Sequence, residues 1–335
     1  MQVKLEPRAL RFARPLQTAY GSLEQRELIL LTLSEDGLSG RGESAPLEPY
    51  DGVAMADALA ALDAYRPVLE ASDHRPRPDV LAACRAIADL PQALAAVDVA
   101  LWELEARRAQ RPLADLLSLH PLNQINLNAS VDAGEPVAAA DAAADAARRG
   151  FRSVKLKVGS GDDVSRVMAA RAAVGPQVAL RLDANGAWSL EQAVSKLEAL
   201  AGAQPELVEE PVHGLAPLRE LRAKTQLALA IDETASDPEA LSAGIADAVC
   251  LKLSRCGGVS GLLDAAAAAR AAGSHVYVGS TYDGPVGIAA AMHAAAAIDP
   301  DYACGLATLG LFEGWDDWRT ANGAIEIPAG PGLGI

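Results

Sequence analysis

Cysteine is scarce in this sequence, and its four copies, Cys84, Cys250, Cys256 and Cys304, are spread along the chain without a CxxC pair. This spacing excludes a disulfide framework and predicts buried free thiols in a reducing compartment. Long hydrophobic runs are also missing. No stretch reaches the roughly 18 apolar residues of a membrane span, and the N-terminus has no apolar segment typical of a signal peptide. We therefore expect a cytoplasmic protein without a membrane anchor.

Basic residues are outnumbered, with 29 Lys and Arg against 44 Asp and Glu, which gives a formal net charge of −15. Phosphate binding requires clustered Lys and Arg, so the composition argues against a nucleic-acid partner. Hydrophobic residues make up 50% of the 335 residues and charged residues 22%. These values are typical of a globular protein, long enough for a barrel and a smaller domain.

The first third of the chain reads as a small α+β domain. Residues 1 to about 50 contain apolar runs separated by a turn signal at 35–37, which predicts antiparallel strands. Residues 53–118 have helical patterns, and between 91 and 110 leucine and valine recur at spacings of three and four residues. We expect a capping domain over 1–118, with the glycine-rich segment 311–335 packing back on it.

From Ile125 the pattern changes to alternating strands and Ala-rich helices. The strand candidates are INLNAS, SVKLKV, VALRLDA, ELVEE, LALAID, DAVCLKL, HVYVGS and a weaker YACGLA. Eight such units favour a parallel barrel over a doubly wound sheet, which would show fewer strands and a glycine-rich phosphate loop. The predicted fold class is therefore α/β, a modified TIM-type (β/α) barrel over 119–310 with an N-terminal α+β capping domain.

Charged residues stand at the ends of successive strand candidates. They are Lys155 and Lys157 in SVKLKVG, Asp183 in LRLDANGAW, Glu209 in LVEEPV, Asp232 in LAIDE and Lys252 in AVCLKLS. In a parallel barrel the carboxyl ends of all strands meet at one mouth, so these side chains are expected to converge. Each motif alone has an ordinary explanation, such as a solvated strand end or a helix cap, but the ordered set indicates a reaction centre.

Three carboxylates are the hard oxygen donors that Mg²⁺ prefers, and Asp183, Glu209 and Asp232 supply them. A divalent ion that also binds a substrate carboxylate would stabilise the negative charge formed when the neighbouring carbon loses its proton. A lysine close to a bound cation is shifted toward its neutral form and can accept that proton. Lys157 and Lys252, from strands on opposite sides of the mouth, could address opposite faces of the substrate.

With these motifs in order, the chain resembles the enolase superfamily, in its muconate lactonising enzyme branch. The resemblance spans nearly the whole length, including the AAVDVALWELEARRAQRPLADLL segment. It implies that Asp183, Glu209 and Asp232 bind Mg²⁺, with Mn²⁺ as a substitute, and that Glu209 rather than Glu210 is the ligand. It further implies that Lys155 and Lys157 form the KxK motif, with Lys157 as the acid and base, and that Lys252 is the lysine of the sixth strand.

Within this branch the loops resemble those of the o-succinylbenzoate synthase family. The segments that carry this resemblance are RPLQTAYG, GRGESAPLEPYDG, INLNAS, VGSTYDGPVGIAAAMHAAAA and ACGLATLGLF. The resemblance implies a lyase of menaquinone biosynthesis that dehydrates a hydroxy-succinyl-cyclohexadiene carboxylate through an enediolate. Arg181, two residues before Asp183, is expected to form ion pairs with the site carboxylates.

Five further residues are candidates for substrate contact, each with a structural alternative. Ser280 and Thr281 would meet the succinyl carboxylate or satisfy the end of the seventh strand. Arg14 and Tyr20 would approach the substrate from the first loop, or be an exposed charge and a packed ring. Asn128 would be a polar contact in the mouth or a residue of a barrel layer.

Two other functions stay open. The first is a racemase of N-succinylamino acids or a related epimerase, in which Lys157 and Lys252 exchange protons on opposite faces. A dipeptide epimerase usually carries an acidic DxD pair near the eighth strand, whereas CGLATLGLF has no acid before Glu313. The second is a non-catalytic, metal-binding barrel. The expected partner is a small carboxylate, and assembly into a homo-oligomer is left open.

Overall fold

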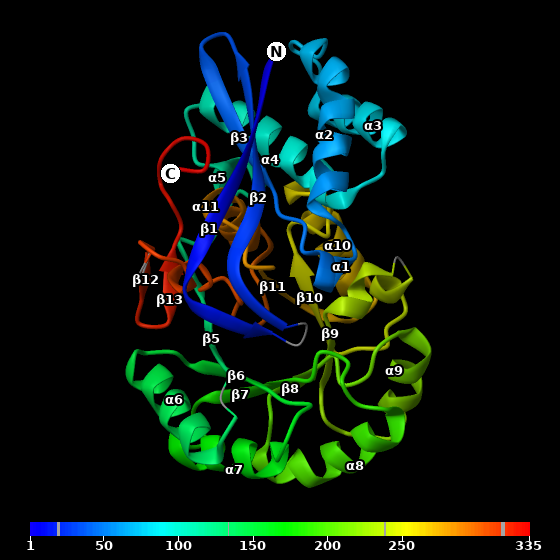
Figure 1. Cartoon of the computed structure of the whole chain (residues 1–335), viewed down its shortest axis with the longest axis vertical. Coiled ribbons are helices and arrows are strands. Elements are labelled where there is room, and N and C mark those ends of the chain that lie inside the picture. Colours follow the sequence, from blue (N-terminus) through cyan, green and yellow to red (C-terminus); the bar gives the residue numbers. More distant parts are fainter. Residues whose placement is uncertain (19–20, 133, 238, 316–318) are drawn as a thin grey trace.

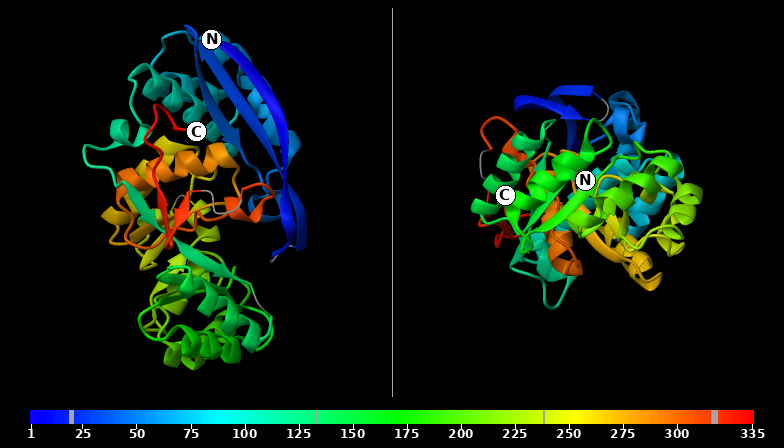
Figure 2. Two further views of the ribbon diagram at one scale, coloured as in Figure 1. Left: turned by 90° about the vertical axis from the view of Figure 1, so that its left-hand side faces the viewer. Right: turned by 90° about the horizontal axis from the view of Figure 1, so that it is seen from below.

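The computed structural model describes residues 1–18, 21–132, 134–237, 239–315 and 319–335. An antiparallel sheet and its helices form a cap at one end, and a curved parallel sheet with outer helices forms the other (Figure 1). Figure 2 shows that the long cap strands extend down one side of the molecule as far as the edge of the parallel sheet. The predicted α/β barrel with a capping sheet is confirmed.

The cap sheet has three strands in the order β1 (Gln2–Thr18), β2 (Gly21–Glu35) and β3 (Leu38–Ser44). Asp36 and Gly37 have φ values of 53° and 78°, as a two-residue hairpin turn requires. The predicted turn at this position is therefore correct. The cap helices are α1 (Glu48–Asp51), α2 (Met55–Glu70), α3 (Arg77–Ile87), α4 (Pro91–Arg108) and α5 (Leu113–Leu117).

Helix α4 lies directly against β3, and two glycines make this approach possible. A Cβ atom at Gly40 would lie 2.1 Å from the Ala100 carbonyl oxygen, and one at Gly42 only 1.8 Å from that of Ala96. Since the obstructing atoms belong to the helix backbone, no side-chain rearrangement could make room for them. Most of α4 is buried, and its alanines are among the buried residues.

The parallel sheet has seven strands in unbroken sequence order from β5 to β11. They are β5 (Asn128–Val131), β6 (Ser153–Lys157), β7 (Ala179–Asp183), β8 (Leu207–Glu209), β9 (Leu229–Ile231), β10 (Ala248–Lys252) and β11 (His275–Gly279). The predicted eighth strand is wrong in its extent. Its place is taken by two isolated bridges, from Cys304 to Leu127 and from Gly305 to Gly279, which span the gap between the edge strands.

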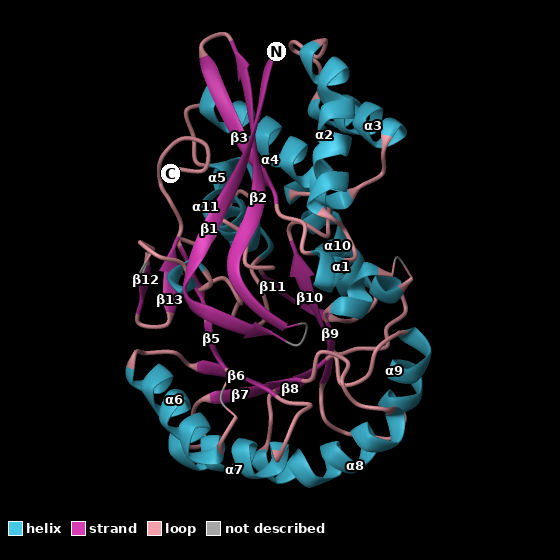
Figure 3. Ribbon diagram, viewed as in Figure 1, coloured by secondary structure: helices cyan, strands magenta, loops and turns pink. Residues whose placement is uncertain are grey.

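Helices cover the outer face of this sheet (Figure 3). They are α6 (Pro136–Arg148), α7 (Asp163–Val174), α8 (Leu190–Leu200), α9 (Leu215–Arg222), α10 (Val259–Ala271) and α11 (Pro285–Ile298). A small sheet joins β4 (Gln124–Asn126), β13 (Ala324–Glu326) and β12 (Thr320–Ala321), and after it Gly332 pairs with Pro112 beside α5. None of the helices in the described ranges combines the length and apolarity that crossing a bilayer requires.

Candidate active site at the barrel mouth

Three carboxylates stand side by side at the ends of adjacent parallel strands. Asp183 ends β7 and is in register with Glu209, which ends β8. Asp232 directly follows β9. All three are at most 3% exposed. The barrel geometry therefore brings together the acids that the sequence spacing selected.

Lys155 and Lys157 lie two residues apart on β6, so both side chains point to the same side of the sheet. The Lys155 ammonium lies 2.8 Å from Asp183 Oδ2 and 3.1 Å from Glu209 Oε1. In the part of the chain that the structure describes, Lys157 forms no ion pair, and it lines the cavity above the carboxylates. The two lysines of the KxK motif thus have different surroundings.

Lys252 approaches from the other side of the mouth, since β10 and β6 are separated by three strands. Its ammonium lies 2.6 Å from Asp232 Oδ2 and donates to the Tyr50 hydroxyl at 2.8 Å. Arg255 lies 3.3 Å from Asp232 Oδ1 and also contacts the Tyr50 hydroxyl. Tyr50 comes from α1 in the cap, so both parts of the chain contribute to this site.

Burial and charge shift the pKa values of these groups in opposite directions. Burial raises the pKa of Glu209 to about 7, against the lowering effect of Lys155. Burial also disfavours the Asp232 carboxylate, but the charges of Lys252 and Arg255 outweigh it and lower its pKa to about 2. Burial alone would lower the pKa of Lys155 and Lys252, yet their carboxylate partners raise both well above the usual value.

A cavity of about 670 Å³ opens above these residues. Asn128 and Ser280 both line it. Asn128 is 3% exposed, and its amide nitrogen has no hydrogen-bond partner among the described residues. The Ser280 hydroxyl lies 2.7 Å from that of Thr308, on the segment that replaces the eighth strand. Both candidates therefore present polar atoms where a small molecule would bind.

The other substrate candidates are placed differently. Thr281 is buried outside the cavity lining, and its hydroxyl bonds to Asp283 Oδ1 at 3.0 Å and to the Ser254 hydroxyl at 3.1 Å. Arg14 is exposed on β1 and does not line the cavity. These placements are those of the structural alternatives: the Thr281 hydroxyl is held by Asp283 and Ser254, and Arg14 is an exposed charge within β1. Tyr20 lies outside the described residues.

Arg181 corrects a further expectation. Its guanidinium pairs with Glu206 at 2.6 Å, donates to the Ala303 carbonyl and lies over the ring of Tyr277 at 5.1 Å. Within the described ranges it forms no ion pair with the three site carboxylates. The reason is its position two residues earlier on β7, one layer below Asp183 in the barrel interior.

Several residues at the site were not selected from the sequence. Tyr277 of β11 donates a 2.8 Å hydrogen bond to Glu209 Oε2. The Cys250 thiol, on β10, lies within 4.8 Å of carboxylate oxygens of Glu209 and Asp232. Its place two residues before Lys252, on the same side of the strand, was the available signal. Tyr50 gave no comparable signal, because its contacts depend on the docking of the cap. Arg255 reaches Asp232 from the turn after β10, within the barrel.

The donor set fits Mg²⁺. Three buried carboxylates provide hard oxygen ligands, whereas burial raises the pKa of the Cys250 thiol well above its usual value and keeps it neutral. Glu210, the second acid of the EEP motif, accepts hydrogen bonds from the backbone nitrogens of Asp232 and Thr234 at 2.9 and 3.1 Å. It therefore supports the loop that carries Asp232, while Glu209 faces the other acids.

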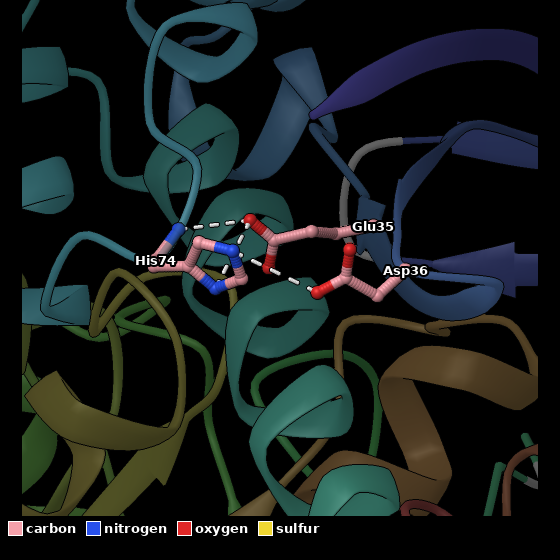
Figure 4. Close-up of side chains that lie close together, drawn as sticks. All are labelled: Glu35, Asp36 and His74. Carbon is pink, nitrogen blue, oxygen red and sulfur yellow. Dashed lines mark hydrogen bonds and ion pairs between the residues drawn. The ribbon is translucent and has the colours of Figure 1, made fainter.

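A second group of ligating side chains lies in the cap, where Glu35, Asp36 and His74 point toward one another (Figure 4). Glu35 is already paired with Arg108, and it accepts a 2.8 Å hydrogen bond from the His74 backbone nitrogen. The Glu35 carboxylate therefore connects the β2–β3 turn with Arg108 at the C-terminal end of α4 and with the backbone at His74. We assign no metal to this group.

Family models match both parts of the chain. The mandelate racemase / muconate lactonizing enzyme N-terminal domain matches residues 1–118, and the enolase C-terminal domain-like model matches 138–335. The chain belongs to the enolase superfamily. Its two matched parts place it in the muconate lactonising branch of this superfamily of enzymes, as the motifs predicted.

Individual relatives in this superfamily differ in activity. The hydrophobic dipeptide epimerase of Enterococcus faecalis is 31% identical over 353 residues, covering 100% of this chain and 98% of the relative. A structure of that epimerase, described as complexed with Mg and a dipeptide, has a TM-score of 0.88 and 29% identity, covering 99% and 98% of the two chains. The o-succinylbenzoate synthase of Mycobacterium bovis is 42% identical over 203 residues, covering 57% of this chain and 60% of the relative.

Proposed function

We propose that this protein is a Mg²⁺-dependent lyase that removes a proton beside a substrate carboxylate, and that it acts as an o-succinylbenzoate synthase. The convergence of three buried carboxylates with lysines on both sides supports the proton abstraction. Asp183, Glu209 and Asp232 would hold the ion. When bound, the ion supplies positive charge that stabilises the negative charge developing on the substrate carboxylate.

The protein residues then carry the proton. The Lys157 amine takes the hydrogen from the carbon beside the carboxylate, and the resulting ammonium gives it to the departing hydroxyl group. One carbon–hydrogen and one carbon–oxygen bond break, a carbon–carbon double bond forms, and water leaves. Lys252, paired with Asp232 and Tyr50, provides a fixed positive charge on the opposite face.

The observation that favours the synthase is the neutral lining of the cavity wall between β11 and β5. Residues 305–311 line the cavity, and none is acidic. Ser280 and Thr308 provide hydroxyl groups there, which suit an anionic succinyl group better than an ammonium group. Asp132 also lines the cavity, but it is exposed, so solvent would screen its attraction for a substrate amine. The identity to the mycobacterial synthase supports the same choice.

A racemase or epimerase is the second candidate, favoured by the full-length similarity to the epimerase of Enterococcus faecalis. The positions of Lys157 and Lys252 across the mouth also suit proton exchange between two faces of one carbon.

The two candidates differ in their products. Purified protein with Mg²⁺ and the hydroxy-succinyl-cyclohexadiene carboxylate should form an aromatic product with a new ultraviolet band. Lys157→Ala should reduce this rate by roughly 10²–10⁴-fold, whereas Lys224→Ala, which removes a half-exposed lysine paired with Glu220, should leave it unchanged. If no aromatic product forms, and N-succinylamino acids or dipeptides instead gain deuterium from D₂O, the protein is a racemase or epimerase.

A further inference from the structure

Two carboxyl groups and one guanidinium are buried together where the cap meets the barrel, outside the set of residues that would contact the ion. Arg26 comes from β2, Glu43 from β3 and Asp283 from the loop before α11. Their exposures are 3%, 6% and 2%. Because burying charged groups is costly without partners, their contacts indicate what this cluster holds in place.

Glu43 joins β3 to the start of α11. Its Oε1 accepts a 2.6 Å hydrogen bond from the Gly284 backbone nitrogen. A Cβ atom at Gly284 would lie 2.5 Å from Glu43 Oε2, and one at Gly287 would lie 2.8 Å from Oε1. The two glycines of the DGPVG segment thus leave the space that this carboxyl group occupies.

Arg26 joins two loops that face the cavity. It donates to the Thr281 carbonyl at 3.2 Å, and to the Ala45 carbonyl at 2.6 Å and that of Pro46. Thr281 follows Ser280 of the cavity lining, and the segment after Pro46 leads to Tyr50, which contacts Lys252. One side chain therefore fixes the distance between the cap loop and the loop after β11.

Asp283 links the loop after β11 to the turn after β10. It accepts hydrogen bonds from the Thr281 backbone nitrogen at 3.2 Å and from the Thr281 hydroxyl at 3.0 Å. That hydroxyl also lies 3.1 Å from the hydroxyl of Ser254, in the turn after Lys252. The cluster consequently supports three segments that carry cavity residues.

We propose that Arg26, Glu43 and Asp283 are positioning residues that fasten the cap to the barrel and hold residues 45–52 and 280–284 in place around the substrate. This inference rests on the proposed function in one respect only, which is the identity of the substrate that the two loops surround. The set is termed the cap latch below.

The buried carboxyl group of Glu43 makes the stability contribution of the cap latch depend on pH. Burial, and then the neighbouring Asp283, raise the pKa of Glu43 to about 8, against the lowering effects of the Gly284 nitrogen and Arg26. The other charged groups facing the latch are Asp51 and Glu27 of the cap and Lys252 of the barrel. Since the native state holds a proton on Glu43 that the unfolded chain releases at lower pH, this contribution to stability falls as pH rises from about 4.5 to 8.

Three variants and three measurements, namely steady-state kinetics, hydrogen exchange and melting temperature, test the cap latch. Arg26→Met and Glu43→Ala should raise KM by about tenfold while kcat stays within about twofold, and should speed hydrogen exchange in peptides covering 45–54 and 280–288. Glu43→Gln, which can still accept the Gly284 hydrogen bond, should restore KM and exchange. It should also flatten the fall in melting temperature between pH 5 and 8 relative to the wild type.

Glu103→Gln is the matched control, because Glu103 is a fully buried acid of the cap that contacts Arg41 and Arg107 instead. It should lower the melting temperature without altering KM or exchange in the two loops. Hydrogen exchange needs no substrate, so it decides the proposal even if the enzyme proves to be a racemase. Unchanged exchange in both loops in Arg26→Met and Glu43→Ala would overturn the cap latch.

Discussion

His293, on α11, shows how a single buried residue couples folding to pH. It is fully buried, its Nδ1 accepts a 3.1 Å hydrogen bond from the Ala114 backbone nitrogen, and its Nε2 donates to the Leu333 carbonyl at 3.2 Å. Both ring nitrogens are satisfied only in the neutral form. Burial accordingly lowers the pKa of His293 to about 4.

The unfolded chain binds this proton near pH 6.5 and the native state only near 4, so the histidine contribution to stability should fall as pH decreases through that window. The total is on the order of 3 kcal/mol. Urea unfolding at pH 7, 6 and 5 measures it. His293→Gln should reduce the loss on acidification relative to the wild type, and His120→Gln, at an exposed position after α5, should not. Parallel pH profiles for the wild type and His293→Gln would contradict this assignment.

At the scale of elements, the contact of β3 with α4 sets how closely the cap sheet sits on its helix. Gly42→Ala would place a Cβ atom 1.8 Å from the Ala96 carbonyl oxygen. We expect the strand and helix to separate, at a cost of about 1–3 kcal/mol or more. Chemical denaturation checks this value.

Gly202→Ala is the matched control, because a Cβ atom there meets nothing within 4 Å. Its effect should stay within about 0.5 kcal/mol. Equal stabilities of the two variants would show that β3 and α4 can move apart without loss.

At the scale of the whole molecule, the barrel mouth presents three buried carboxylates that a divalent ion would bind in the folded state but not in the unfolded chain. Mg²⁺ should therefore raise the melting temperature, by a stabilisation of about 2.7 kcal/mol at a hundredfold excess over Kd. Thermal unfolding in Mg²⁺ and in EDTA measures this shift. Asp183→Asn and Glu209→Gln should lose it.

Glu35→Gln, in the second group of ligating side chains, should lower the melting temperature measured in EDTA, because Glu35 forms an ion pair with Arg108. It should keep the increase in melting temperature that Mg²⁺ causes. If the Mg²⁺-dependent increase in melting temperature survives in Asp183→Asn and disappears in Glu35→Gln, the ion binds in the cap and not at the barrel mouth.

The sequence by itself determined the parallel barrel, the cap sheet and the convergence of Asp183, Glu209 and Asp232. These features follow from local rules, since alternation along a strand and the length of each βα unit place successive strand ends at one mouth. The weak YACGLA segment shows the limit, because its local pattern could not reveal that, within the described residues, two isolated bridges take the place of an eighth strand.

The tertiary structure alone decided which side chains meet across long separations. Tyr50 reaches Lys252 over 202 residues, and Glu43 reaches Gly284 over 241. Thr281 turns toward the cap latch rather than the cavity because Asp283 and Ser254 bind its hydroxyl. Such contacts depend on how the cap docks against the barrel, and this depends on close packing between surfaces whose residues have no fixed spacing in the chain.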